Sequence, residues 1–210
     1  MQTPAKLLLE NKAWSEAMLG RKPDFFTKLA KEQTPEFLWI GCADSRVPAD
    51  TIVKAQPGEI FVHRNIANQV VTTDFNGLSV LQYAVNVLKV KHVIVCGHYG
   101  CGGIETALQA QHEELAIANK WLAHIKEIYR LYQDELDGLP PEKRSNRLVE
   151  WNVVEQVQRL AHSSIMQSAW MSGQKISLHG WVYGLNDGLL DELVQIDDSA
   201  PIHKIYRYAH

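Results

Sequence analysis

Two cysteines and one histidine in this sequence have the types and the spacing of a metal-binding set. Cys42 opens the segment Cys-Ala-Asp-Ser-Arg, and His98 and Cys101 lie three positions apart in a glycine-rich stretch. Two thiolates and one imidazole form a borderline-soft ligand set that suits Zn²⁺. Three protein ligands leave the fourth tetrahedral position open, which is typical of a catalytic rather than a structural zinc.

Other thiol chemistries fit these spacings poorly. A phosphatase or rhodanese loop needs an arginine six positions after its cysteine, where Pro48 stands, and Arg46 comes too early. The sequence has no Cys-x-x-Cys pair of the thioredoxin kind. Cys96 falls inside an apolar run, where a cysteine usually acts as a small hydrophobic residue. Metal binding is therefore the favoured interpretation.

The elements that must position these side chains alternate between strands and helices. Helices are expected near residues 4–18, 23–31, 104–135 and 145–172, and in a segment that Asp74 caps. Strands are expected at residues 36–41, 59–63, 90–96, 176–182 and 189–196, the last two forming a hairpin. The sequence thus predicts an α/β fold: a mostly parallel central sheet with an antiparallel edge strand, flanking helices and amphipathic N-terminal helices.

The predicted sheet explains how distant ligands could meet. Ligands of such sheets bind beyond the carboxyl ends of the strands, where the winding direction reverses. Cys42 follows the first expected strand directly, and His98 follows the third. Both side chains are therefore expected at the same edge of the sheet.

Composition limits the class of protein. The chain has 210 residues, of which 46% are hydrophobic and 21% charged, and a formal net charge of −3. These values are ordinary for a globular protein and disfavour nucleic acid as a partner. We expect no signal peptide or membrane span, and the three cysteines favour a reducing, cytoplasmic location. One domain is predicted over residues 1–210, with 1–33 as a helical arm packing on the sheet or on a partner subunit.

Longer motifs resemble those of the β-class carbonic anhydrases, and specifically of their bacterial branch. They are EFLWIGC at 36–42 with CADSRV after it, PGEIFVHRNIAN at 57–68, CGHYGCGG at 96–103 and SLHGWVYGLNDGLL at 177–190. The resemblance implies one zinc ion per subunit and reversible hydration of carbon dioxide to bicarbonate and a proton by hydroxide on the zinc. It also implies a homodimer or a homotetramer built from two dimers.

Carried over position by position, the resemblance makes Cys42, His98 and Cys101 the zinc ligands. Asp44 and Arg46 match a dyad in which the arginine holds the carboxylate away from the metal. Without that restraint Asp44 itself would become a ligand, in a closed form of the site. The dyad thus accounts for a carboxylate so near a ligand cysteine.

The resemblance also indicates residues around the metal. Gln33 matches a glutamine near the substrate. Three residues match the apolar carbon dioxide pocket: Phe61, Ile66 and Tyr83. Three others match a non-catalytic site where bicarbonate favours the closed form and so inhibits the enzyme allosterically: Trp39, Arg64 and Tyr183.

Two other functions remain open at this point. One is hydrolysis of carbon disulfide or carbonyl sulfide on the same scaffold, and the other is a non-catalytic module that binds zinc or senses bicarbonate. Asp44 and Arg46 argue against the module, because a structural zinc needs neither. The proton-shuttle residue is also open among His63, His92, His112 and His124.

Overall fold

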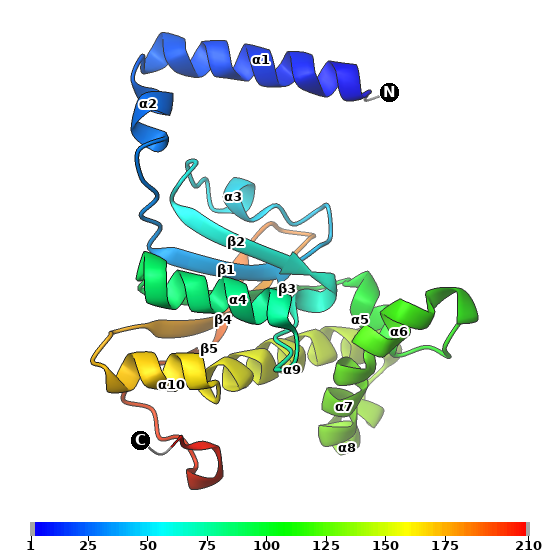
Figure 1. Ribbon diagram of the computed structural model, residues 1–210. Coiled ribbons are helices and arrows are strands. Elements are labelled where there is room, and N and C mark those ends of the chain that lie inside the picture. Colours follow the sequence, from blue (N-terminus) through cyan, green and yellow to red (C-terminus); the bar gives the residue numbers. More distant parts are fainter. Residues whose placement is uncertain (1–2, 209–210) are drawn as a thin grey trace. The chain divides into compact units, whose positions relative to one another are not determined.

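The computed structural model describes residues 3–208 and divides the chain into two compact units, Met1–Thr34 and Pro35–His210 (Figure 1). The first unit contains helix α1 (Pro4–Arg21) and helix α2 (Phe25–Leu29). The Thr3 side chain caps α1 by accepting a hydrogen bond from the Lys6 backbone N–H at 3.2 Å. No residue of α1, which is described throughout, is buried.

The second unit is built on a sheet of five strands in the order β2-β1-β3-β4-β5. The strands are β1 (Phe37–Cys42), β2 (Ile60–Asn65), β3 (His92–His98), β4 (Ser177–Tyr183) and β5 (Leu190–Ile196). The pairs β1–β2, β1–β3 and β3–β4 are parallel, and β4–β5 is antiparallel. The predicted fold class and all five strands are confirmed, with boundaries shifted by a residue or two.

The strand order creates a reversal at the centre of the sheet. From β1 the chain passes to β2 on one side, and then returns to β3 on the other side of β1. Crevices that bind ligands form at such a point, beyond the carboxyl ends of the two strands. Cys42 ends β1 and His98 ends β3, so the fold places both at this reversal.

The helices of the second unit differ from the prediction mainly because the long helices expected are divided into shorter ones. They are α3 (Ala49–Ile52), α4 (Phe75–Tyr83), α5 (Gly102–Ala107), α6 (Ala116–Trp121), α7 (Ala123–Leu131), α8 (Gln133–Asp137), α9 (Pro141–Ala161) and α10 (Ser164–Met171). The single helix expected over 145–172 is two helices, because the Ser163 side chain caps α10. Asp74 caps α4 as predicted, while the short α3 was not expected. Among the described helices, none combines the length and apolarity needed to cross a membrane.

Helix α9 passes very close to the central strands (Figure 1). A Cβ atom added at Gly97 in β3 would lie 2.6 Å from Val153 Cγ2, and one at Gly180 in β4 would lie 2.9 Å from Val153 Cγ1. Real Cβ contacts are not this short, so glycine is required where the helix crosses these strands. The crossing point is adjacent to His98, and α9 can therefore support the end of β3.

Candidate metal centre

Three buried ligand atoms converge beyond the ends of β1 and β3. The donor atoms of Cys42, His98 and Cys101 all lie within 4.8 Å of one another. The two sulfur atoms are 3.9 Å apart. Two thiolates bound to a tetrahedral zinc at about 2.3 Å would be about 3.8 Å apart, so the spacing of the pair fits this metal.

The His98 ring is oriented for metal binding through Nε2. Its Nδ1 lies 3.0 Å from the Tyr99 carbonyl oxygen, which assigns the proton to Nδ1 and leaves a lone pair on Nε2. The ring is fully buried, and Nε2 has no hydrogen-bond partner among the described residues. A buried polar atom without a partner costs about 1–3 kcal/mol. A cation between the three side chains would remove this cost, so the residues present fit a metal ion.

The two sulfurs share a hydrogen bond that biases one toward the thiolate. This bond to Cys101 lowers the pKa of Cys42, with further support from the backbone N–H groups of Asp44 and Ala67. The same bond, together with burial, raises the pKa of Cys101. Metal binding would displace the shared proton and leave two thiolates.

Cys96 lies in the same strand as His98 but differs from the ligand cysteines. Burial raises the pKa of its thiol, which donates to the Gly97 carbonyl at 3.4 Å. The thiol therefore stays neutral and belongs to an apolar cluster with Trp39 and Ile94. This matches the small hydrophobic role expected for it.

Asp44 and Arg46 form a two-pronged ion pair beside the ligand atoms. Arg46 Nε donates to Asp44 Oδ1 at 3.0 Å and Nη2 donates to Oδ2 at 2.7 Å. The guanidinium holds the pKa of Asp44 well below its usual range, so the carboxylate is ionised. Its Oδ2 is still only 3.7 Å from His98 Nε2. Arg46 Nη2 also donates to the Gly100 carbonyl and so joins the two ligand segments.

Side chains from β2 and α9 hold the backbone around Cys42. Arg64 donates through Nε to the Cys42 carbonyl at 2.8 Å and through Nη2 to the Asp44 carbonyl. Ala67 lies in the 3-10 turn Ile66–Asn68 with φ 62°, which is unusual for a residue other than glycine. Asn152 Nδ2 of α9 donates to the Ala67 carbonyl at 2.9 Å and stabilises this conformation.

Sequence reasoning missed the contribution of α9, although a signal was present. Asn152 and Gln156 are both buried and occupy the apolar stripe of the helix between Leu148 and Leu160. Gln156 Oε1 accepts from the Val70 N–H at 2.7 Å, and its amide donates to Asn152. Amide side chains at the core positions of an amphipathic helix indicate hydrogen bonds to backbone groups of another segment, because buried polar groups need partners.

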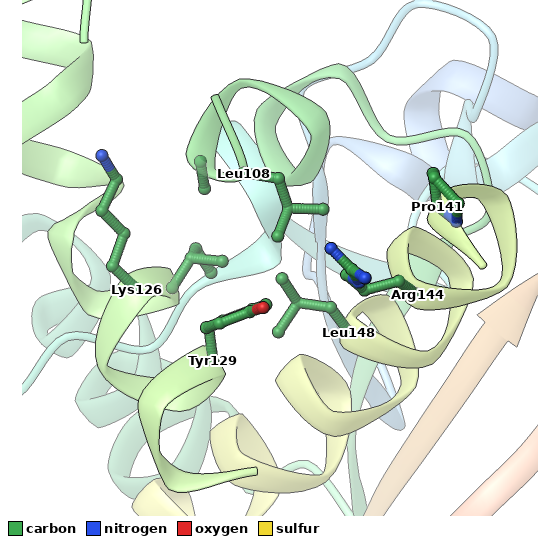
Figure 2. A pocket seen from close by; sticks show the side chains of 8 residues that line it. Leu108, Lys126, Tyr129, Pro141, Arg144 and Leu148 are labelled. Carbon is green, nitrogen blue, oxygen red and sulfur yellow. The ribbon is translucent and has the colours of Figure 1, made fainter. Parts of the chain in front are cut away.

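A cavity of about 450 Å³ between α5, α7 and α9 is separate from this cluster (Figure 2). None of its eight lining residues is one of the three candidate ligands. Arg144, which borders it, donates to the carbonyls of Leu136 and Leu139 and so stabilises the segment after α8. The cavity is therefore not the candidate metal centre.

Comparison with known proteins identifies the family. The carbonic anhydrase family matches residues 37–190, which include all three candidate ligands. The structure of a Coccomyxa β-carbonic anhydrase in complex with acetazolamide superimposes with a TM-score of 0.88 at 39% identity, covering 93% of this chain and 89% of that one. This chain belongs to the β-class carbonic anhydrase family.

Further β-class relatives cover almost the same length. A carbonic anhydrase of Emericella nidulans is 47% identical over 209 residues, which are 98% of this chain and 90% of the relative. One of two tetrameric β-carbonic anhydrases from Sordaria macrospora superimposes with a TM-score of 0.85 at 38% identity, covering 90% of this chain and 96% of that one. The predicted family is thus confirmed, and the bacterial branch stays a prediction.

The residues predicted to line the carbonic anhydrase substrate pocket are all partly exposed in the single chain. The Phe61 and Tyr83 rings are 5.9 Å apart, centroid to centroid. Ile66 is 43% exposed, and its Cγ2 would lie 2.8 Å from a Cβ at Gly103, two residues after the candidate ligand Cys101. Of the three, Ile66 therefore has the clearest connection to the metal centre.

The residues of the predicted bicarbonate site share one face of the sheet. Trp39, Arg64 and Tyr183 have the same side-chain direction, since Gly41 pairs with Arg64, Trp39 with Ile94 and His98 with Tyr183. Trp39 is buried edge-on against Trp181, in a cluster that Tyr183 also joins. Gln33 belongs to the N-terminal unit and is exposed there.

Substitution of the cysteines should separate ligands from packing residues. Cys42→Ala is expected to lose bound metal, because two donors cannot complete the site. Cys96→Ala is the matched control and should keep the metal, since the Cys96 thiol donates to the Gly97 carbonyl and packs among apolar side chains. Metal content of the purified full-length variants, measured by mass spectrometry of the elements, checks both. Equal metal content in Cys42→Ala and the native protein would contradict the assignment.

Proposed function

We propose that this carbonic anhydrase catalyses the reversible hydration of carbon dioxide to bicarbonate and a proton, with one zinc ion held by Cys42, His98 and Cys101. The observation that carries this proposal is the convergence of two buried sulfurs on a buried histidine nitrogen that has no partner among the described residues. The names of relatives at up to 47% identity support the same reaction.

Zinc, when bound, would supply an acidic water. A bound-water pKa of about 7 is known for the carbonic anhydrase whose zinc is held by three histidines. Two thiolates would weaken the Lewis acidity of the ion, so the pKa of the water is expected to be higher in this protein. Asp44 would accept a hydrogen bond from a water held there and would orient it. Asp44 can do so because its carboxylate is ionised and lies beside the three donors. Ile66, Phe61 and Tyr83 would keep the adjacent carbon dioxide pocket apolar.

Arg46 determines whether Asp44 assists or blocks the site. Two hydrogen bonds to the carboxylate and one to the Gly100 carbonyl fix the guanidinium. With Oδ2 only 3.7 Å from His98 Nε2, an unrestrained carboxylate would take the fourth ligand position itself. The pair thus corresponds to an open form of the site, and a closed form requires it to separate.

Bicarbonate regulation is proposed at Trp39, Arg64 and Tyr183. An indole N–H, a guanidinium and a phenol are suitable donors for an oxyanion. The contacts of Arg64 explain how such a site could reach the metal. Because Arg64 holds the Cys42 and Asp44 carbonyls, an anion that draws it away would loosen the segment that carries the dyad. The match at these three positions also supports the bacterial branch.

A homodimer or homotetramer is proposed from the exposed apolar surface of the N-terminal arm. Leu7, Leu8 and Leu9 are 58%, 73% and 68% exposed, and Trp14 is 43% exposed. A helix that carries so many exposed apolar side chains is expected to bury them against a partner. Tetrameric β-carbonic anhydrases from Sordaria macrospora agree with this. Gln33, just after the arm helices, would then complete a substrate site.

The cytoplasm is proposed as the location of the enzyme. The three cysteines are free in the structure, which suits a reducing compartment. Carbon disulfide or carbonyl sulfide hydrolysis is the alternative activity, because both molecules resemble carbon dioxide in shape and electrophilicity.

Removal of zinc tests the proposed reaction. Stopped-flow hydration of carbon dioxide should be abolished by chelation and restored by one equivalent of zinc per chain. Arg46→Ala should keep its zinc and lose roughly 100-fold or more in turnover, because the released Asp44 carboxylate would take the fourth ligand position and would no longer orient the water. Turnover that survives chelation, or that is greater on carbon disulfide or carbonyl sulfide, would contradict the proposal.

Bicarbonate inhibition tests the regulatory site. The native enzyme should show sigmoidal inhibition, and Tyr183→Phe should weaken it about 10-fold, the effect of one lost hydrogen bond to an anion. Tyr183 is preferable to Arg64 here, because Arg64 also supports the ligand segment. Tyr129→Phe, in α7, is the control and should behave as native. Hyperbolic inhibition that Tyr183→Phe leaves unchanged would exclude the site.

The mass of the protein in solution tests the assembly. Light scattering should give two or four chains. Replacing Leu7, Leu8 and Leu9 together with glutamine should shift the mass toward that of one chain, because the apolar contact is removed. A native mass of one chain of 23.8 kDa would disprove the proposed oligomer.

A further inference from the structure

Tyr99 connects a candidate metal ligand to helix α9. Its carbonyl accepts the Nδ1–H of His98 at 3.0 Å, and its backbone N–H donates to the Tyr183 carbonyl at 3.1 Å. Its phenol reaches in another direction and donates to Glu150 Oε1 of α9 at 2.8 Å. Burial and the carboxylate raise the pKa of Tyr99, so the phenol keeps the proton that it donates.

Glu150 is itself held in place and cannot easily turn away. Arg147 Nη1 donates to Glu150 Oε2 at 2.6 Å, while Arg147 Nε donates to Glu135 of α8 at 2.6 Å. The Arg147 guanidinium also lies 4.6 Å from the ring centroid of Trp151. The acceptor of the Tyr99 phenol is therefore part of a connected network on a long helix.

An anchor at Tyr99 matters because the backbone around it is intrinsically flexible. His98 and Cys101 are joined by a turn in which Gly100 adopts φ +62°, and Gly97 comes before the turn. Glycine lowers the cost of such dihedrals but also raises the conformational freedom of the chain. Within this turn, the Tyr99 side chain is long enough to reach α9, where its hydroxyl donates to Glu150.

We propose that Tyr99 and Glu150 are positioning residues for the metal centre. Their hydrogen bond fixes the Tyr99 carbonyl, the carbonyl fixes the His98 tautomer and ring, and Nε2 is thereby aimed at Cys42 and Cys101. The inference rests on the proposed metal centre, and it assigns a role to two residues outside the ligand set and the dyad. Groups that orient metal ligands in this way typically contribute 10–100-fold to metal affinity.

The chain offers a closely matched control for this bond. Tyr132 OH donates to Glu155 of the same helix at 2.6 Å, and both residues are half-buried, as are Tyr99 and Glu150. This second tyrosine–glutamate pair makes no described contact with a candidate ligand. Loss of either hydroxyl should lower the free energy of unfolding by a similar amount. A difference in zinc affinity between Tyr99→Phe and Tyr132→Phe therefore reports an effect on the metal centre.

The experiment compares Tyr99→Phe, Glu150→Ala, Glu150→Gln and Tyr132→Phe in the full-length protein. Zinc Kd is measured by competition with a chromophoric chelator, and stability by urea unfolding. Cobalt substitution adds the visible absorption bands of the metal, which report ligand geometry. We expect Tyr99→Phe and Glu150→Ala each to weaken zinc binding about 10-fold or more and to alter the cobalt spectrum. Their combination should add little, because both break one bond.

The other variants define the outcome. Glu150→Gln should weaken zinc binding less than Glu150→Ala does, because its one amide oxygen can still accept from Tyr99, although its amide nitrogen cannot accept from Arg147. The two Glu150 variants test the bond even where Tyr99→Phe folds poorly. Tyr132→Phe should leave the Kd within two-fold. An unchanged zinc Kd in both Tyr99→Phe and Glu150→Ala would overturn this inference and leave the metal centre standing. An equal loss of zinc affinity in Tyr132→Phe would do the same. A native protein without zinc affinity would overturn the metal centre and this inference with it.

Discussion

A buried imidazole nitrogen facing two buried sulfurs is the constraint from which the rest of this structure follows. An imidazole nitrogen is costly to bury without a partner, and in this protein it meets two sulfurs at one point. The reversal of the sheet between β1 and β3 brings them together, and a spacing of 3.9 Å between the sulfurs suits a tetrahedral ion. The neighbouring elements then serve to hold the three donors in this arrangement.

Helix α9 provides much of that support from behind the sheet. It can approach β3 and β4 closely because Gly97 and Gly180 present no side chain to Val153. At this distance its polar residues reach the segments beside the candidate ligands. Asn152 stabilises the left-handed Ala67 beside Cys42, and Glu150 anchors Tyr99 beside His98. Close packing and ligand geometry are thus parts of one arrangement.

The Asp44–Arg46 ion pair has two hydrogen bonds and lies directly beside the candidate ligand atoms. Exposed ion pairs generally contribute little to stability, and Arg46 is substantially exposed. Its proposed value is geometric, because two parallel hydrogen bonds hold the carboxylate beside the candidate ligand atoms and would keep it from binding the metal. Arg64 acts on the backbone of the same segment, so two arginines hold the conformation of residues 42–46, at and after the end of β1.

The sequence alone determined the fold class and the five strands, and it predicted which three side chains meet in the candidate metal centre. Alternating elements, glycine punctuation and a Cys…His-x-x-Cys pattern are local signals, and side chains at the ends of parallel strands must share one edge of a sheet. Helix breaks were less predictable, as at Ser163, where a single cap outweighs a continuous apolar pattern. Only the tertiary structure decided the supporting contacts. Tyr99 and Glu150 are 51 positions apart and Ala67 and Asn152 are 85 apart, so their pairing depends on how closely α9 packs on the sheet, which no local pattern encodes.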